Sequence, residues 1–210
     1  IGYRIPNFDF RVPGVTSMSC DTHKYGYAPK GTSVILFHNA DLRHYMYFCY
    51  PDWTGGLYCT PTLAGSRSGA ISAACWASLM HIGYSGFCEI TQNIITTRDY
   101  IADNIRREIP GIDLLVEPET MILTLSSKIY NIYQVGDKLQ KRGWHLNQLQ
   151  NPAAIHLCLT KLHTLDGVAD DFIDELQNVI EELETSEDIS EGGTASVYGM
   201  AGKLPDGPIS

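Results

Sequence analysis

Apolar residues recur at helical spacing in two long stretches, which limits the chain to folds with at least two amphipathic helices. One stretch covers 166–184 and the other about 87–108, where Pro110-Gly111 follows the last turn. In the first stretch the apolar positions are Val168, Phe172, Leu176, Val179, Ile180 and Leu183. Residues 166–191 also hold eleven acidic and no basic residues, and we interpret this charge as a solvated helix face.

Shorter elements fill the rest of the chain. We predict helices over 68–81 and 131–142, and strands at 15–20, 33–39, 112–116, 120–126, 144–149 and 154–160. Residues 51–66 are rich in glycine and proline and are predicted to be loop. Strands alternating with helices indicate an α/β first part, and the strand–helix–strand remainder indicates a small α+β domain.

Composition excludes several classes of protein. The net charge of −9 comes from the acidic stretch. Of the 24 acidic residues, 24 − 11 = 13 lie elsewhere, and these are outnumbered by the 15 lysines and arginines. No basic patch carries interleaved aromatic residues, so nucleic acid is not an expected partner. The chain has no apolar run long enough for a transmembrane helix, and its start does not resemble a signal peptide.

The six cysteines predict neither a zinc ribbon nor a thioredoxin-like site, because no two form a C-x-x-C pair. We expect no metal site. Scattered cysteines in apolar surroundings are typical of buried thiols in a reducing compartment.

One stretch carries reactive groups, from Ser17 to Gly26. A strand leads into a loop that presents Lys24 at the strand end. A lysine that forms an imine must lose its proton easily, and burial or a neighbouring cation achieves this. His23, with the hydroxyls of Ser17, Ser19 and Thr22, could bind an anion beside it. The alternative is an ordinary solvated His-Lys turn.

The same stretch, with Lys24 followed by Tyr25-Gly26, resembles the lysine signature of the group II pyridoxal-dependent decarboxylases. Further blocks narrow the resemblance to the sphingosine-1-phosphate lyases. They are Phe8-Asp9-Phe10-Arg11-Val12-Pro13-Gly14, Trp53-Thr54-Gly55-Gly56-Leu57-Tyr58, Pro61-Thr62-Leu63-Ala64-Gly65-Ser66-Arg67 and Tyr198-Gly199-Met200-Ala201.

The resemblance implies roles for individual residues. Lys24 would attach pyridoxal 5'-phosphate, and His23 would contact the cofactor's phosphate. Lys30 would bind the phosphate of the lipid substrate, while Gly65 and Ser66 would reach the cofactor of a partner subunit.

Two further candidates follow from the same blocks. Tyr198 would approach the site from the small domain, or it could simply hold the tail against the core. Arg67 precedes a predicted helix and is a candidate active-site residue, although arginines in such places are commonly surface residues.

The implied fold is the fold-type I pyridoxal-phosphate-dependent transferase fold. Residues 1–84 would form the C-terminal part of the cofactor-binding large domain, 85–185 a small α+β domain, and 186–210 an acidic, glycine-rich tail. The implied enzyme is a homodimer with shared active sites. It would cleave the C2–C3 bond of a phosphorylated sphingoid base by retro-aldol chemistry, giving a long-chain aldehyde and phosphoethanolamine in sphingolipid degradation.

The family pattern places an aspartate that binds the pyridine nitrogen in a block before residue 1. We therefore expect the 210 residues alone to be inactive. Two alternatives stay open: an amino-acid decarboxylase with the same cofactor, and a catalytically incomplete fragment. The expected location is the cytosol, or the cytosolic face of the endoplasmic reticulum if an anchor lies outside this chain.

Overall fold

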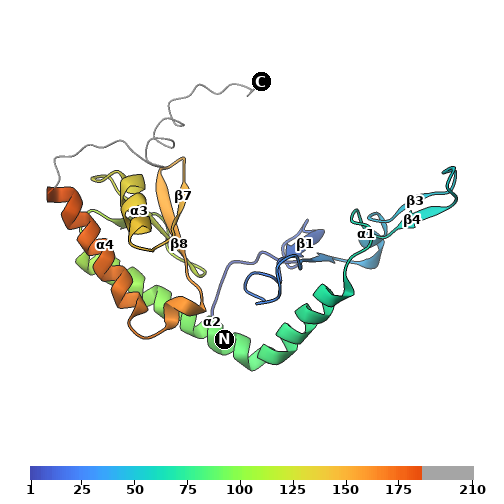
Figure 1. Cartoon of the computed structure of the whole chain (residues 1–210), viewed down its shortest axis with the longest axis horizontal. Coiled ribbons are helices and arrows are strands. Elements are labelled where there is room, and N and C mark those ends of the chain that lie inside the picture. Colours follow the sequence, from blue (N-terminus) through green and yellow to red (C-terminus); the bar gives the residue numbers. More distant parts are fainter. Residues whose placement is uncertain (186–210) are drawn as a thin grey trace, which may run out of the picture. The chain divides into compact units, whose positions relative to one another are not determined.

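The computed structural model describes residues 1–185 (Figure 1). They divide into two compact units, one from Gly2 to Phe87 and one from Cys88 onward. The predicted tail 186–210, which includes Tyr198, lies outside the described residues.

The unit from Gly2 to Phe87 contains two small antiparallel sheets. Strands β1 (Ser17–Cys20) and β2 (Val34–Phe37) form where strands were predicted, although both are shorter than the predicted ranges, and they pair antiparallel. A short helix, α1 (Ala40–His44), follows them. Strands β3 (Phe48–Tyr50) and β4 (Tyr58–Thr60) then form a hairpin. The prediction of loop throughout 51–66 is therefore wrong at β4, where three residues are too few to show strand alternation.

The predicted helices 68–81 and 87–108 form α2 (Gly69–Glu108), which is interrupted at Gly83. The φ angle of Gly83 is 65°, a left-handed conformation that glycine adopts without steric cost. Residues 82–86, which were predicted to separate two helices, therefore belong to α2, and the interruption is confined to Gly83.

The unit from Cys88 onward is built on a four-stranded antiparallel sheet with strand order β5-β6-β8-β7. Its strands are β5 (Asp113–Leu114), β6 (Ile122–Ser126), β7 (Asn147–Leu149) and β8 (Ala154–Cys158). Helix α3 (Ile132–Lys141) begins where the Asn131 side chain accepts a hydrogen bond from the Tyr133 amide. A 3-10 turn, η1 (Lys161–Thr164), leads to α4 (Val168–Thr185).

Apolar faces of helices and sheet meet in the core of this second unit. Buried residues come from α2 (Ile101, Ile105), β6 (Leu123, Leu125), β8 (Ile155, Leu157) and α4 (Phe172, Leu176, Val179, Ile180). The predicted stripe of α4 is confirmed at its centre, whereas Val168 and Leu183 at its ends are half-buried. Removing this apolar area from water is the main stabilising contribution to the fold.

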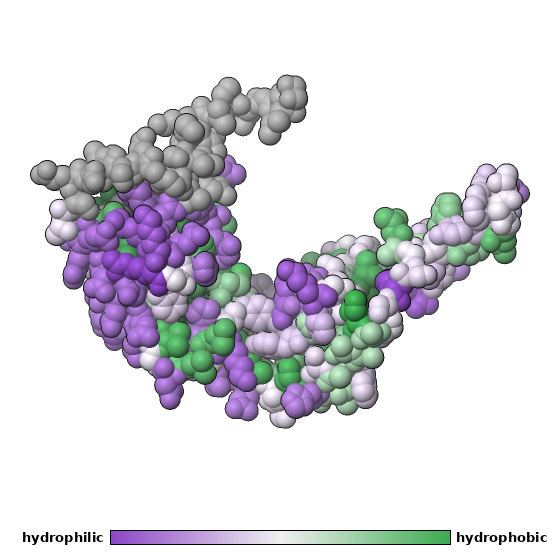
Figure 2. All heavy atoms as spheres, viewed as in Figure 1, coloured by the Kyte–Doolittle hydropathy of each residue, from purple (hydrophilic) through white to green (hydrophobic). Residues whose placement is uncertain are grey.

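The unit from Gly2 to Phe87 buries very little. Within it, only Thr22, Ala28 and Thr32 are buried. Many large apolar side chains stay exposed, among them those of Leu36 and Trp76. Figure 2 shows hydrophobic residues at the visible surface of this unit, whereas hydrophilic residues dominate that of the other. So small a core cannot by itself stabilise a unit of this size.

Candidate active site

A tight turn directly after β1 presents Lys24. The Lys24 amide donates to the Asp21 carbonyl at 3.0 Å, and the Ala28 amide donates to the Thr22 carbonyl at 3.1 Å. A Cβ on Gly26 would lie 2.5 Å from the Thr22 carbonyl oxygen, closer than any side chain can approach. The turn therefore needs glycine at position 26, which explains part of the lysine signature.

The Lys24 side chain is exposed and carries an ion pair. Its Nζ lies 2.9 Å from Asp21 Oδ2, and 65% of the side chain is accessible. The hydrogen bond from Lys24, followed by one from the Ser33 hydroxyl at 2.8 Å, lowers the pKa of Asp21 below its ordinary value. Among the described residues Lys24 is exposed and paired with a carboxylate, so its activation by burial or a neighbouring cation stays a prediction.

His23 points its Nδ1 at the Thr32 carbonyl oxygen. A carbonyl oxygen only accepts, so Nδ1 carries the proton. The remaining ring nitrogen, Nε2, can then donate to a phosphate only when the ring is positively charged. The contact joins the lysine turn to the segment before β2.

A cavity of about 460 Å³ opens beside this turn, within the same unit. Its polar wall comes from Thr22, Gly31, Thr32, Ser33, Arg67, Ser68 and Ser72, and its apolar wall from Val34, Ile71 and Cys75. The Thr22 hydroxyl is buried and has no hydrogen-bond partner among the described residues. An unsatisfied buried hydroxyl is costly, so this one is available as a hydrogen-bonding group for a ligand, a water molecule or further protein.

The cavity has the chemistry of an anion site. Arg67 supplies a positive charge, and Ser68 and Ser72, at the start of α2, supply hydroxyls near the positive end of the helix dipole. Its volume lies within the range of small-molecule sites. The residues present therefore fit a phosphate-bearing cofactor or substrate.

Of the other described residues predicted for the active site, one lines this cavity and the rest lie close to lining residues in the sequence. Arg67 lines it, and Lys30 precedes the lining residue Gly31 on an exposed turn. Gly65 and Ser66 directly precede Arg67 and are exposed. The sequence reasoning missed Ser68 and Ser72, whose spacing of four on a helix was the available signal.

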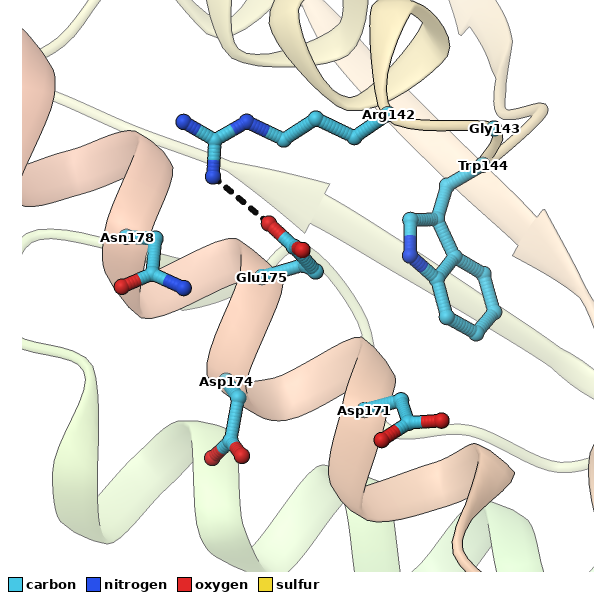
Figure 3. Close-up of a pocket in the computed structure, with 7 residues that line it drawn as sticks. All are labelled: Arg142, Gly143, Trp144, Asp171, Asp174, Glu175 and Asn178. Carbon is cyan, nitrogen blue, oxygen red and sulfur yellow. Dashed lines mark hydrogen bonds and ion pairs between the residues drawn. The ribbon is translucent and has the colours of Figure 1, made fainter.

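A larger cavity, of about 560 Å³, lies in the unit from Cys88 onward (Figure 3). Arg142 and Trp144 line it together with the α4 residues Asp171, Asp174 and Glu175, and Arg142 points to Glu175 and pairs with it at 2.6 Å. Of the residues predicted for the site, none that the structure describes lines it. An acidic helix face beside an ion pair defines no ligand, so we assign this cavity no role.

The comparisons with known proteins support the sequence resemblance, although no family model matches the chain. The chain is 46% identical over 206 residues to the sphingosine-1-phosphate lyase of Saccharomyces cerevisiae, covering 97% of the chain and 35% of that protein. It is 45% identical to the Drosophila melanogaster enzyme of the same name, with 98% and 37% covered.

Solved structures show the same relationship. The sphingosine-1-phosphate lyase of Burkholderia pseudomallei matches with a TM-score of 0.80 and 39% identity, over 99% of this chain and 46% of that one. A glutamate decarboxylase from Lactobacillus brevis matches with a TM-score of 0.69 and 21% identity, over 86% of this chain and 43% of the other, which shows the fold alone.

These likenesses assign the chain to the α/β fold of the fold-type I pyridoxal-phosphate-dependent enzymes, as predicted. Within that class, the chain belongs over nearly all of its length to the sphingosine-1-phosphate lyase family, so the resemblance seen in the sequence motifs is confirmed.

The chain spans about a third of the length of the curated relatives it matches. Among residues 1–185, no helix has both the length and the apolarity to cross a membrane. The same residues contain no group of three or more His, Cys, Asp or Glu side chains that could hold a metal ion.

Proposed function

We propose that the protein containing this chain is a pyridoxal-phosphate-dependent lyase. Its substrate would be a phosphorylated sphingoid base, cleaved at C2–C3 to a long-chain aldehyde and phosphoethanolamine. The observation that carries the proposal is the turn that presents Lys24 beside a cavity with a buried, unpartnered Thr22 hydroxyl. Homology to named lyases supports the substrate class.

The cavity would hold a phosphate group. Arg67 contributes charge, and the Thr22 hydroxyl and the serine hydroxyls at the start of α2 contribute hydrogen bonds. His23 would add a charged donor at Nε2 when its ring is protonated. Lys30 is proposed to bind the substrate's phosphate as a flexible point charge, which suits a dianion at the edge of a site.

Lys24 is proposed to attach the cofactor and later to hold and return a proton at Nζ. Both roles require the neutral amine, so the ion pair with Asp21 must open. Pyridoxal phosphate, when bound, supplies an electron sink for the electrons of the broken bond.

The small core of the unit from Gly2 to Phe87 supports the proposal that further protein covers it. We propose that the remainder of the large domain, and a second subunit that receives Gly65 and Ser66, complete the site. Residues 1–84 would then belong to the cofactor-binding domain and 85–185 to the small domain, with Tyr198 contributed from the tail. The active protein would work in the cytosol or on the cytosolic face of the endoplasmic reticulum.

Borohydride reduction of the full-length protein, followed by peptide mapping, tests the attachment. An imine becomes a stable amine, so we expect a pyridoxyl adduct on the peptide that contains Lys24. The variant Lys24→Arg keeps the charge and should lose the adduct. The variant Lys30→Ala should keep the adduct while losing turnover of dihydrosphingosine phosphate.

The reaction itself is tested with two kinds of substrate. We expect aldehyde from dihydrosphingosine phosphate and none from glutamate or aromatic amino acids. Carbon dioxide from an amino acid, without aldehyde, would establish a decarboxylase instead. An unlabelled Lys24 in a full-length, folded protein would refute both enzymes.

A further inference from the structure

Two cysteines lie directly opposite each other in the β3–β4 hairpin. Cys49 pairs with Cys59 in the antiparallel register, so both side chains project from the same face. Both are exposed free thiols. The prediction that the cysteines are buried is therefore wrong for these two in the part of the chain that the structure describes.

The backbone hydrogen bonding of the hairpin shows whether Cys49 and Cys59 form a hydrogen-bonded or a non-hydrogen-bonded pair. Opposite residues in an antiparallel ladder alternate between hydrogen-bonded and non-hydrogen-bonded pairs. If Phe48 and Thr60 were a non-hydrogen-bonded pair, Tyr47 and the next residue, Pro61, would have to exchange backbone hydrogen bonds. Proline has no N–H to donate, and the Tyr47 amide already donates to the His44 carbonyl at 3.1 Å.

Phe48 and Thr60 are therefore the hydrogen-bonded pair, and the two cysteines form the non-hydrogen-bonded pair next to it. In such pairs the Cα atoms are about 4.5 Å apart and the side chains approach most closely. A disulfide spans Cα separations of about 4.4–6.8 Å, so the backbone already has a spacing that a disulfide can bridge.

Neighbouring side chains hold the strands in this register. Phe48 and Tyr58 project from the face opposite the cysteines, with ring centroids 6.3 Å apart. Trp53, in the connecting loop, packs edge-on against Tyr58 at 5.9 Å. The aromatic contacts align the hairpin without help from the thiols, and they leave the cysteine face uncovered within this unit.

We propose that Cys49 and Cys59 form a redox-active dithiol that closes to a disulfide by exchange with a low-molecular-weight disulfide. One thiolate attacks a sulfur of that reagent, releases one small thiol and leaves a mixed disulfide. The second cysteine thiolate then displaces the other small thiol. Two protein thiols are oxidised, one small disulfide is reduced to two thiols, and their protons pass to the products.

The thiols also influence each other's ionisation. The hydrogen bond with Cys49, followed by loss of solvation, raises the pKa of the Cys59 thiol. Only the thiolate reacts, so closure should accelerate as the pH rises above neutral.

Glutathione redox buffers test the proposal on the cofactor-loaded, full-length protein, with differential alkylation and mass spectrometry as the readout. At a fixed ratio of oxidised to reduced glutathione, doubling both concentrations should lower the ratio of Cys49–Cys59 disulfide to dithiol about twofold, because closure releases two thiols. The glutathione adduct on exposed Cys20, which faces Val34 across β1 and β2, should not change.

Two variants complete the test. In Cys49→Ser the mixed disulfide on Cys59 cannot resolve, so we expect a stable glutathione adduct there. Cys20→Ser should leave the closure of the hairpin unchanged. If Cys49 and Cys59 in the folded protein carry only glutathione adducts, or stay reduced in buffers that modify Cys20, the proposal is wrong. None of these readouts depends on catalysis, so they stand apart from the test of the proposed lyase.

Discussion

Replacing Gly26 with alanine should open the turn that presents Lys24. The added Cβ would lie 2.5 Å from the Thr22 carbonyl oxygen and 2.9 Å from the Thr22 Cα, and both are backbone atoms that cannot move aside cheaply. Thr22 must shift, which strains or breaks the 3.1 Å hydrogen bond between its carbonyl and the Ala28 amide. Losing that bond costs about 0.5–1.5 kcal/mol, and overpacking costs about 1–3 kcal/mol.

The sum, about 1.5–4.5 kcal/mol against the ordered turn, can be measured at one amide of the full-length protein. Hydrogen exchange of Ala28 should accelerate roughly tenfold to a thousandfold, since each 1.4 kcal/mol is about tenfold. Gly69→Ala is the matched control, because a Cβ there meets nothing within 4 Å and should leave Ala28 unchanged. Unchanged exchange of Ala28 in Gly26→Ala would refute the steric argument.

Two further predictions concern the unit from Cys88 onward. Leu176→Ala removes a fully buried α4 side chain and should lower the free energy of unfolding by about 2–5 kcal/mol in chemical denaturation, whereas Leu165→Ala, at a 55% exposed position, should change it by less than about 1 kcal/mol. The hydrogen bond from Lys138, with Arg142 adding to it, lowers the pKa of Glu182. This carboxylate therefore stabilises the fold at pH values above its ordinary pKa, and the stabilisation is lost as the pH falls through the lowered pKa. Glu182→Gln should therefore cost at most about 1 kcal/mol at neutral pH, and the difference from the unchanged protein should vanish in strong acid; a difference that persists there would contradict the assignment.

Long periodic segments were predictable from the sequence, whereas short ones were not. The stripe of α4 and the isoleucines of α2 fix their helices, because many positions repeat the same spacing. Helix α1 and strand β4 have too few residues to show a period. The sheet of the second unit follows from predicted strands, but its order brings β6 beside β8, a long-range pairing that no local pattern encodes.

In the candidate site, too, local features were predictable from the sequence and long-range ones were not. The turn around Lys24 was predictable because it is local, and even the ion pair with Asp21 follows from a spacing of three residues. The cavity was not, because it forms where the Thr22 turn meets the start of α2, with Ser68 and Ser72, far away in the sequence. The pairing of Cys49 with Cys59 likewise depends on a hairpin register that residue types alone do not specify.

The uneven distribution of buried side chains affects how this protein should be studied. A thermal melt of the chain would mainly record the cooperative loss of the unit from Cys88 onward, which holds nearly all the buried apolar residues. The region with Lys24 could open at lower temperature with little heat absorbed. A high melting temperature would thus say nothing about whether Lys24 is in place, and probes within residues 2–87 are needed to follow it.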